Sequence, residues 1–568
     1  MTVCLSFFTL VSGLYAGGKS DQSGRSTVYY NGTVITMTEN GDGTPHTAEA
    51  VCIADGKITA TGTYKEAVSA AGRNPVMQDL KGRTMLPGFL DSHSHISSYA
   101  QTFAIAQLGR TQSFDDIVSE MSAFLKESHL KPGEWLVGFG YDHNALKEKI
   151  HPTREVLDRI SRDIPIAITH TSGHMGVFNT KALELCGITA QTPNPKGGMI
   201  ARENGTQNPN GYMEEQAFMQ YSARIQPPAV DFAELVHRAE EHYFSYGITS
   251  TQDALMGAKE FALMMPLADS GAFRIDVTGY VDLRNAKEYA QKYAALHNVY
   301  KNHFKIGGYK IFLDGSPQGR TAWLTRPYLP VPGAAPDTPD GDPAYKGYPV
   351  YTDSQIESFI RQSLADGMSL HAHCNGDAAA DQFIGAFEKV IALDHVKDTF
   401  RPTMIHCQLI RPDQFPRMTA CGMIASLFPA HVWYWGDIHL ANLGPERGGR
   451  ISAVHSALQA GTVYTFHQDT PVIPPDMMET LWCAVNRVTK EGVQLSEAEK
   501  VTPYEGLKAL TVNGAYEIWE ENSKGTIEPG KRADLVILDR NPLTVPPMDI
   551  RTIRVMTTLK DGVEVYNR

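Results

Sequence analysis

The sequence predicts an α/β protein built around a (β/α)8 TIM barrel, with a composite β-sandwich made from both ends of the chain and an inserted subdomain. Two observations predict this fold. Apolar strand-like runs alternate with helical stretches through the middle of the chain, a pattern typical of parallel α/β folds. Short strands and turns flank that middle on both sides. With 568 residues, the chain also exceeds one ordinary hydrophobic core, so several domains are expected.

Residues 1–26 are expected to be a leader, separate from the folded body. Val3 to Ala16 is apolar, long enough for the core of a signal peptide and too short to span a bilayer. This favours export to the periplasm. No lysine or arginine precedes the apolar run, however, so a disordered start and a cytoplasmic location stay open. No other segment reaches transmembrane length, and no membrane span is predicted.

Residues 27–83 and 512–568 are expected to form one β-sandwich domain. Asn31-Gly32 is a hairpin turn signal between two strand-like runs near the N-terminus. The C-terminal end shows the same pattern of short strands and turns, with strand-like runs over 533–539 and 553–559. Strand-rich ends that enclose a different middle indicate a small domain assembled from both termini.

The barrel is assigned to residues 84–98 and 229–511, where eight apolar strand candidates occur. The first precedes His93, and the others run over 247–251, 273–281, 308–313, 368–373, 402–406, 423–427 and 462–466. Helical stretches such as 353–365 and 378–393 lie between them. Reactive groups in such barrels lie at the carboxyl ends of the strands.

Residues 99–228 separate the first two barrel strands and are interpreted as an inserted subdomain that roofs the barrel mouth. They hold two further strands, over 135–140 and 164–169, and a stretch rich in Pro, Gly and Asn over 189–211. A second irregular stretch, 328–348, is too long for an ordinary connection and is interpreted as a lid.

Composition and charge narrow the class of protein. The net charge of −12 is spread without long acidic blocks, which argues against a nucleic-acid partner. The seven cysteines contain no C-x-x-C pair, so neither a disulfide framework nor a thiolate zinc site is suggested. A small-molecule substrate is the expected partner, and a homodimer is left open.

A metal site is first indicated by His93 and His95. Residues two apart in an extended strand point to the same side, so the two imidazoles face one point in space. Imidazole pairs suit zinc and similar first-row ions. A bare H-x-H is a weak signal, but this pair follows a strand-like run and is joined by further candidates downstream.

Lys310 lies inside an apolar strand, where a lone ammonium group is costly and needs a partner. Carboxylation by carbon dioxide is one solution, since the resulting anion can bridge two cations. Pairing with an acidic neighbour such as Asp314 is the other. The spacing alone favours the pairing with an acidic neighbour.

Two later strands end in histidine. His371 and His373 share a face, and His373 lies nearer the mouth, so it is the better ligand. His371 is interpreted as a packed or supporting histidine. His406 also closes a strand.

Asp469 follows the last strand candidate. A carboxylate there can ligate a metal, accept a proton from metal-bound water and relay it to a leaving amine. The alternative for Asp469 is an N-cap of the next helix.

The chain resembles the amidohydrolase superfamily, and within it the YtcJ-like group that includes N-substituted formamide deformylases. Matching segments cover nearly the whole chain after Thr27. They are LPGFLDSHSH (86–95), GHMGVFNTKALELCGI (173–188), GGMI…GYMEEQA (197–217), YKIFLDGS (309–316), HAHCNGDAA (371–379), IHCQL (405–409), HQDTPV (467–472) and KGTIEPGKRADLVILDRNPL (524–543). The first and last of these are highly specific.

The resemblance implies a divalent metal centre, with zinc as the default, as one ion or two. Its implied ligands are His93, His95, Lys310 as N6-carboxylysine, His373, His406 and Asp469. Asp469 is implied as the general acid/base, with metal-activated hydroxide attacking a carbonyl carbon. Three further residues are substrate-binding candidates: His174, Asp314 and Trp433.

The leading hypothesis is therefore a metal-dependent hydrolase of C–N bonds other than peptide bonds, in an amide, N-acyl or N-formyl amine. Departures from the family pattern at His467-Gln468, Cys374-Asn375 and 429–437 weaken the transfer of formamide specificity. The alternatives are a deaminase, lactonase or decarboxylase reaction on the same centre, or a non-catalytic regulatory homologue.

Overall fold

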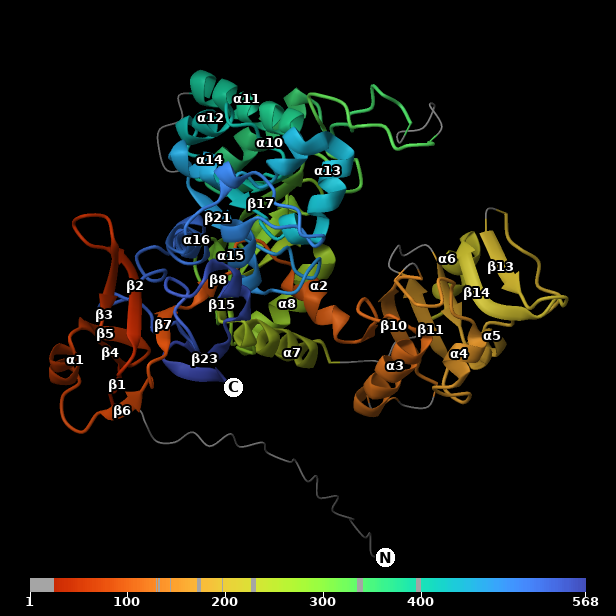
Figure 1. Cartoon of the computed structure of the whole chain (residues 1–568), viewed down its shortest axis with the longest axis horizontal. Helices are drawn as coiled ribbons and strands as arrows, with labels where there is room; N and C mark the ends of the chain where they lie inside the picture. Colours follow the sequence, from red (N-terminus) through yellow and green to blue (C-terminus); the bar gives the residue numbers. More distant parts are fainter. Residues whose placement is uncertain are drawn as a thin grey trace, which may run out of the picture.

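An eight-stranded parallel sheet forms the centre of the molecule (Figure 1). The computed structural model describes residues 25–128, 130, 133–143, 145–170, 175–196, 198–225, 231–334, 341–394 and 400–568. The strands of the central sheet are β8 (Phe89–Leu90), β15 (Ile248–Met256), β16 (Asp276–Asp282), β17 (Phe304–Phe312), β18 (Ser369–Cys374), β19 (Thr403–His406), β20 (Ile424–Leu427) and β21 (Tyr464–Phe466). Each strand pairs with the next one along the chain, and the eight strands correspond to the eight sequence candidates.

The sheet curls so that the segments following its first and last strands meet. The backbone amide of His95 donates to the carbonyl of Thr470 at 2.9 Å, and that of Asp469 donates to the carbonyl of His93 at 3.2 Å. Ser94 and Thr470 form an isolated parallel bridge. The two ends of the sheet are therefore joined at the carboxyl ends of β8 and β21.

Helices surround the outside of this sheet (Figure 1). They are α2 (Ile96–Thr102), α7 (Phe232–Ser245), α8 (Ala258–Ser270), α9 (Lys287–Lys292), α10 (Asp353–Ala365), α11 (Asp377–Asp394), α12 (Phe415–Ala420), α13 (His431–Gly449), α14 (Val454–Gln459), α15 (Met477–Asn486), α16 (Pro503–Leu510) and α17 (Val512–Glu517). Local signals set their ends. Thr502 and Glu505 form a capping box before α16, and α8 stops at Gly271, whose φ of 73° is left-handed.

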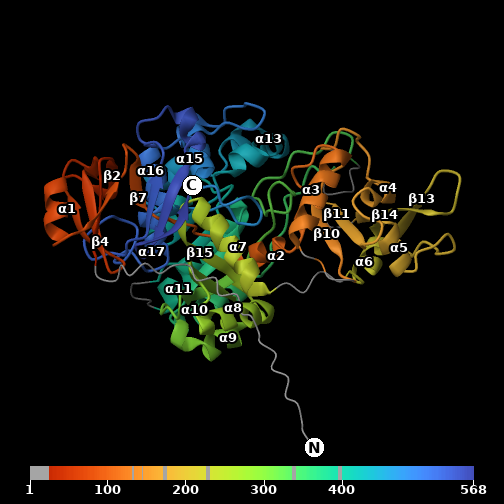
Figure 2. The ribbon, with the colours of Figure 1, turned by 90° about the horizontal axis from the view of Figure 1, so that it is seen from below.

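The insertion between β8 and β15 folds around its own mixed sheet. The strand order is β13 (Gly198–Arg202), β14 (Pro209–Glu215), β12 (Met175–Phe178), β11 (Ile166–His170), β10 (Leu136–Tyr141) and β9 (Ala106–Gln107). Its helices are α3 (Phe114–Ser128), α4 (Arg154–Asp158), α5 (Thr180–Leu185) and α6 (Gln216–Ser222). Figures 1 and 2 show this unit to one side of the central sheet. The Pro/Gly/Asn-rich stretch 189–211 is not irregular throughout, because β13 and the start of β14 lie in it.

Strands from both ends of the chain share one sheet. Its order is β24 (Val563–Asn567), β23 (Val555–Lys560), β22 (Leu535–Leu538), β7 (Thr84–Pro87), β2 (Thr33–Glu39) and β3 (Pro45–Ala48). A second sheet is formed by β5 (Lys57–Gly62), β4 (Ala50–Ala54), β1 (Thr27–Tyr30) and β6 (Val76–Asp79), with α1 (Tyr64–Ala70) beside it. Side chains of both sheets, such as Val51 and Leu535, pack in one hydrophobic cluster.

Three sequence expectations fall partly or wholly outside the described residues. The leader is one, because only its last two residues are described. Residues 335–340 of the expected lid and His174 are the others. Across the described part of the chain, no helix combines the length and apolar character needed to cross a bilayer.

Candidate metal centre and substrate cleft

Four of the predicted ligands meet where the two ends of the central sheet join. His93 and His95 follow β8, and Asp469 follows β21. The Oδ1 atom of Asp469 lies 3.4 Å from Nε2 of His93 and 3.2 Å from Nε2 of His95. Oδ2 of the same carboxylate lies 4.0 Å from Nε2 of His406. One carboxylate thus faces three imidazoles from strands that are far apart in the sequence.

His373 and His406 complete the imidazole group from neighbouring strands. Cys374 of β18 pairs with His406 of β19, which brings the two strand ends level. His406 Nε2 lies 3.1 Å from His373 Nδ1. Five predicted side chains therefore form one cluster, as the strand-end argument expected.

Lys310 of β17 reaches the same cluster. Its Nζ atom lies 3.2 Å from Nε2 of His93, and the side chain is buried. Within the described residues it forms no ion pair with a carboxylate at 4.0 Å or less. Burial lowers the pKa of Lys310 to about 7, against the opposing charges of Asp469 and Glu517.

Asp314, the alternative partner of Lys310, is occupied elsewhere. Its carboxylate accepts backbone N–H groups of Asn375 at 2.9 Å, Gly376 at 2.7 Å and Trp323 at 3.0 Å. Burial raises its pKa to about 7. Asp314 therefore ties the segment after β18 to the segment after β17, and it lies 4.0 Å from Nε2 of His373.

Two ligand candidates adopt a left-handed backbone, which is uncommon for residues other than glycine. The φ angle is 78° at His406 and 54° at Asp469. Such conformations cost about 1–3 kcal/mol each and persist where the surroundings impose them, often at functional sites. The backbone turns sharply as each strand ends, and this turn directs both side chains into the cluster.

Burial favours neutral imidazoles at His93, His373 and His406, close to an ionised carboxylate at Asp469. Burial lowers the pKa of His93 and His406 well below the ordinary value and that of His373 to about 4. Burial opposes ionisation of Asp469, but its hydrogen bond with His95 and the nearby positive charges outweigh this, so its pKa lies below the usual range. Neutral imidazoles and a carboxylate are the forms that bind metal.

The donor set fits a divalent cation. Ligand atoms of His93, His406 and Asp469 all lie within 4.8 Å of one another. His95, His373 and Lys310 adjoin them, so the nitrogen and oxygen donors exceed what one ion needs. Histidine nitrogen with carboxylate oxygen is a donor set typical of zinc.

His467 supports this cluster, a role that the sequence argument missed. Its Nε2 atom lies 3.1 Å from Nδ1 of His406, and its Nδ1 atom lies 2.9 Å from Oγ of Ser426. All three side chains are buried. The two-residue spacing between His467 and Asp469 was the available signal, because residues two apart in a strand share a face.

His371 and Trp433 lie in packed surroundings. The His371 ring is buried and stacks on Tyr280, with 3.8 Å between ring centroids, which agrees with a packed histidine. Trp433 meets Trp482 edge-on and lies against the guanidinium of Arg551. These contacts give Trp433 a packing role, and its contact with substrate stays a prediction.

A cleft of about 920 Å³ lies between the insertion, the end of α7 and the segment 471–474, and none of the predicted ligands lines it. Its walls come from α2, which starts directly after His95, and from Pro471 and Val472, which follow Asp469. Aromatic side chains line it, and Arg110 supplies a cation; the aromatic residues are Tyr99, Phe103, Phe139 and Tyr246. Its size lies within the range of small-molecule sites.

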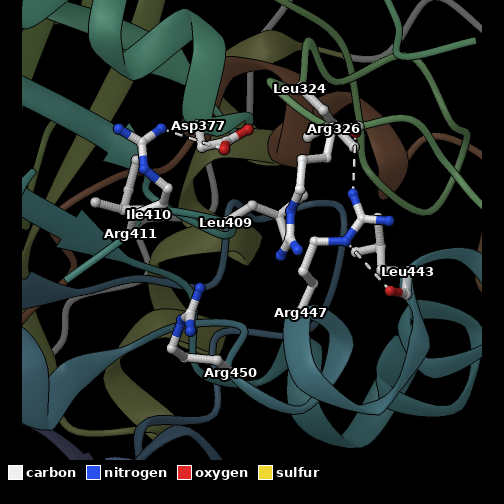
Figure 3. A pocket seen from close by; sticks show the side chains of 9 residues that line it. All are labelled: Leu324, Arg326, Asp377, Leu409, Ile410, Arg411, Leu443, Arg447 and Arg450. Atoms are coloured by element: carbon white, nitrogen blue, oxygen red, sulfur yellow. Dashed lines mark hydrogen bonds and ion pairs between the residues drawn. The ribbon is translucent and has the colours of Figure 1, made fainter. Parts of the chain in front are cut away.

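A smaller cavity lies among the segments that follow β17 to β20 (Figure 3). Several arginines line it, but bonds within the protein hold three of them. Arg326 pairs with Glu446 at 3.2 Å. Arg411 pairs with Asp377 at 3.2 Å, and Arg447 donates to the backbone carbonyls of Leu443 at 3.3 Å and Arg326 at 3.0 Å. These contacts fasten neighbouring segments to one another, and none of the predicted ligands lines the cavity.

Comparison with known proteins agrees with the resemblance drawn from the motifs. The model of the amidohydrolase family matches residues 77–566. The chain is 27% identical to N-substituted formamide deformylase of Arthrobacter pascens, over 92% of this chain and 95% of that protein. It is also 27% identical to the putative amidohydrolase YtcJ of Bacillus subtilis (strain 168), over 95% and 99%. An uncharacterized metal-dependent hydrolase from Pyrococcus furiosus shares the fold, with a TM-score of 0.70 and 24% identity over 91% of this chain and 100% of that one.

Proposed function

Because the chain belongs to the amidohydrolase family, we propose that it is a metal-dependent hydrolase that cleaves a C–N bond in an amide, N-acyl amine or N-formyl amine. The observation that carries this proposal is the convergence of His93, His406 and Asp469 from three distant strand ends. The similarity to N-substituted formamide deformylase of Arthrobacter pascens supports a C–N bond as the target.

The proposed architecture is a closed (β/α)8 barrel over 84–98 and 229–511, a β-sandwich over 27–83 and 512–568, and an inserted domain over 99–228. The bridge between Ser94 and Thr470 supports closure of the barrel. The hydrophobic cluster shared by the two terminal sheets supports the sandwich. The cleft beside α2 supports a role for the insertion in shaping the substrate site.

In the proposed mechanism, His93, His95, His373 and His406 would hold one or two zinc ions together with Asp469 and carboxylated Lys310. A divalent ion bound there would lower the pKa of water towards neutrality and polarise a carbonyl group. Asp469 takes a proton from the attacking water and gives it to the nitrogen that leaves. Its ionised state in the cluster suits the first of these steps.

The decisive experiment combines metal analysis with a substrate panel. Purified protein is assayed on N-substituted formamides, N-acyl amino acids, lactones and amino-heterocycles, before and after treatment with a chelator. We expect zinc in the purified protein, hydrolysis of formamides or N-acyl amines, loss of turnover with the metal and recovery when zinc is added. Turnover of lactones or heterocycles alone would favour the alternative reactions. A zinc-loaded protein inactive on all four classes would favour a regulatory homologue.

The imidazole of His467 is expected to strengthen metal binding through His406. Replacing His467 with phenylalanine keeps a buried ring but removes the partner of His406 Nδ1. Partners of ligating histidines contribute about 10–100-fold to metal affinity. We therefore expect His467→Phe to weaken zinc binding by about that factor, measured by competition with a chromophoric chelator. The matched control is Phe428→Leu, since Phe428 also packs against the His467 ring. Equal zinc affinity in wild type and His467→Phe contradicts the prediction.

If Lys310 is carboxylated, a small carboxylate should be able to replace its side chain. Alanine at this position removes the side chain and leaves space for a small carboxylate beside His93. We expect Lys310→Ala to lose bound zinc and turnover, and to regain part of both when acetate is added at high concentration. Addition of methylammonium is the control, because it restores a cation and no metal ligand. Rescue by methylammonium in place of acetate would indicate that Lys310 acts as an ammonium group.

A further inference from the structure

A second group of side chains of metal-binding types lies in the insertion, on a different sheet from the cluster of His93, His406 and Asp469, which is called the barrel centre below. Asp142 and His143 follow β10, and His170 ends the neighbouring strand β11. β10 and β11 are parallel, and Tyr141 pairs with His170, so their carboxyl ends are level. Loops beyond the carboxyl ends of adjacent parallel strands are where α/β sheets place ligands.

Three donor atoms converge at this point. Nδ1 of His143 lies 3.2 Å from Nε2 of His170. Oδ1 of Asp142 lies 3.6 Å from Nε2 of His170 and 3.8 Å from Nδ1 of His143. The carboxylate oxygen lies near both imidazoles and so closes a triangle of possible metal-ligand atoms.

The size of the triangle suits zinc. In a tetrahedral site with bonds of about 2.0–2.2 Å, the ligand atoms lie roughly 3.3–3.6 Å apart. The three measured separations, 3.2, 3.6 and 3.8 Å, bracket that range. An ion can therefore contact all three atoms at ordinary bond lengths with little movement of the side chains.

Neighbouring rings hold His143 in place. His151 stacks on His143 with 4.0 Å between centroids and on Tyr212 with 4.2 Å. Nδ1 of His151 lies 3.1 Å from the hydroxyl of Tyr141.

The site is also accessible. The side chain of His170 is 8% exposed, that of His143 27% and that of Asp142 41%. One ligand is thus anchored in the protein while the other two border solvent. A metal held by three protein ligands keeps a position open for water or another group.

We propose that Asp142, His143 and His170 bind a divalent transition-metal ion, zinc by its donor set, in the inserted domain. The ion is additional to the barrel centre, so this site stands or falls independently of the proposed hydrolase activity. It fastens the loop after β10 to the end of β11.

The test is the number of zinc ions bound per chain. Metal-free full-length protein is equilibrated with a fixed free zinc concentration, and bound zinc is measured by mass spectrometry. We expect His143→Ala and Asp142→Asn each to bind one ion fewer than wild type. Asp142→Asn is nearly isosteric, which guards against loss of the fold. His455→Ala, which removes a histidine from α14, is the control and should keep the full number.

A zinc-soaked crystal provides the second measurement. Anomalous signal between Asp142, His143 and His170 is expected in wild type, and its loss is expected in His143→Ala with the barrel signal retained. An unchanged zinc count in both variants, with no anomalous signal in the insertion, would overturn the proposal and leave a hydrogen-bonded histidine pair. That result does not alter the barrel centre, whose zinc depends on other residues.

Discussion

Replacing Asp469 with asparagine is expected to lower kcat by about 10³-fold while the protein stays folded. General acid–base catalysis contributes about 10²–10⁴-fold, and an amide cannot take or return the proton. The variant also removes the charge that faces His93 and His95. The measurement is kcat and KM on the best substrate from the panel, together with zinc content and melting temperature.

Asparagine is the informative substitution because of the backbone at this position. Asp469 has a φ of 54°, a conformation that asparagine tolerates better than most residues. Alanine would mix loss of the carboxylate with backbone strain. The matched control is Asp394→Asn, which removes a surface carboxylate paired with Arg361 at 2.9 Å. If Asp469→Asn keeps a tenth or more of wild-type kcat, another group carries the proton.

The strands of the central sheet could be predicted because their apolar runs are short and clearly bounded. Helix α10 also matches its predicted range of 353–365. β15 is the informative exception. The predicted strand stopped at residue 251, where polar residues begin, but β15 continues to Met256. Gln252 is buried there because its side chain donates to Glu517 at 3.0 Å.

That partner lies 265 positions further along the chain, so no local pattern could reveal it. The same limit affects the domain boundary at residue 512. Glu517 of α17 accepts a hydrogen bond from Thr465 at 2.6 Å and packs with the central sheet, although its residue number falls in the range assigned to the sandwich. Buried polar pairs of this kind are set by the tertiary fold alone.

The convergence of the metal ligands could be predicted from the sequence, but other parts of the candidate site could not. Strand-end placement in a parallel sheet brings His93, His373, His406 and Asp469 together whatever the loops do. The aromatic cleft instead depends on how the insertion lies against α2, and the support from His467 depends on the exact register of β19 to β21. The donor triangle at Asp142 arises from a pairing between two strands of the insertion. The cleft and the donor triangle do not follow from residue spacing, whereas the two-residue spacing between His467 and Asp469 was a signal for the supporting histidine.

A buried ion network at the start of β16 is expected to contribute to stability. Asp276 lies at the start of β16, and its Oδ2 atom forms ion pairs with Nζ of Lys524 at 2.6 Å and with Nζ of Lys560 at 3.0 Å. Its Oδ1 atom lies 2.6 Å from Nδ1 of His303. Lys524 also pairs with Glu520 at 2.6 Å. The network therefore joins the sheet to the C-terminal segment.

We expect Asp276→Asn to destabilise the protein by about 1–3 kcal/mol, because the buried lysines lose one shared charged partner while Lys524 keeps Glu520 and Lys560 keeps Asp534. The matched control is Asp269→Asn. Asp269 pairs with Lys301 at the same 2.6 Å, but its side chain is 59% exposed, whereas that of Asp276 is 1% exposed. A surface pair contributes about 0–1 kcal/mol. Thermal and urea unfolding of both variants should show a clearly larger loss of stability for Asp276→Asn. Equal losses in unfolding free energy would show that burial of the network does not increase its contribution to stability.

The difference in unfolding free energy between wild type and Asp276→Asn should depend on pH, which provides an independent check. The charges of Lys524 and Lys560 outweigh burial and hold the pKa of Asp276 well below its ordinary value, and Lys524 and Lys305 likewise lower that of Glu520 to about 2. A carboxylate whose folded pKa is depressed contributes stability above its unfolded pKa and loses it as the pH falls through the folded value. The stability gap between wild type and Asp276→Asn should therefore be full at pH 6–8 and narrow below about pH 4. A gap that stays constant down to pH 3 would mean that lost packing at Asp276, in place of lost charge, causes the destabilisation.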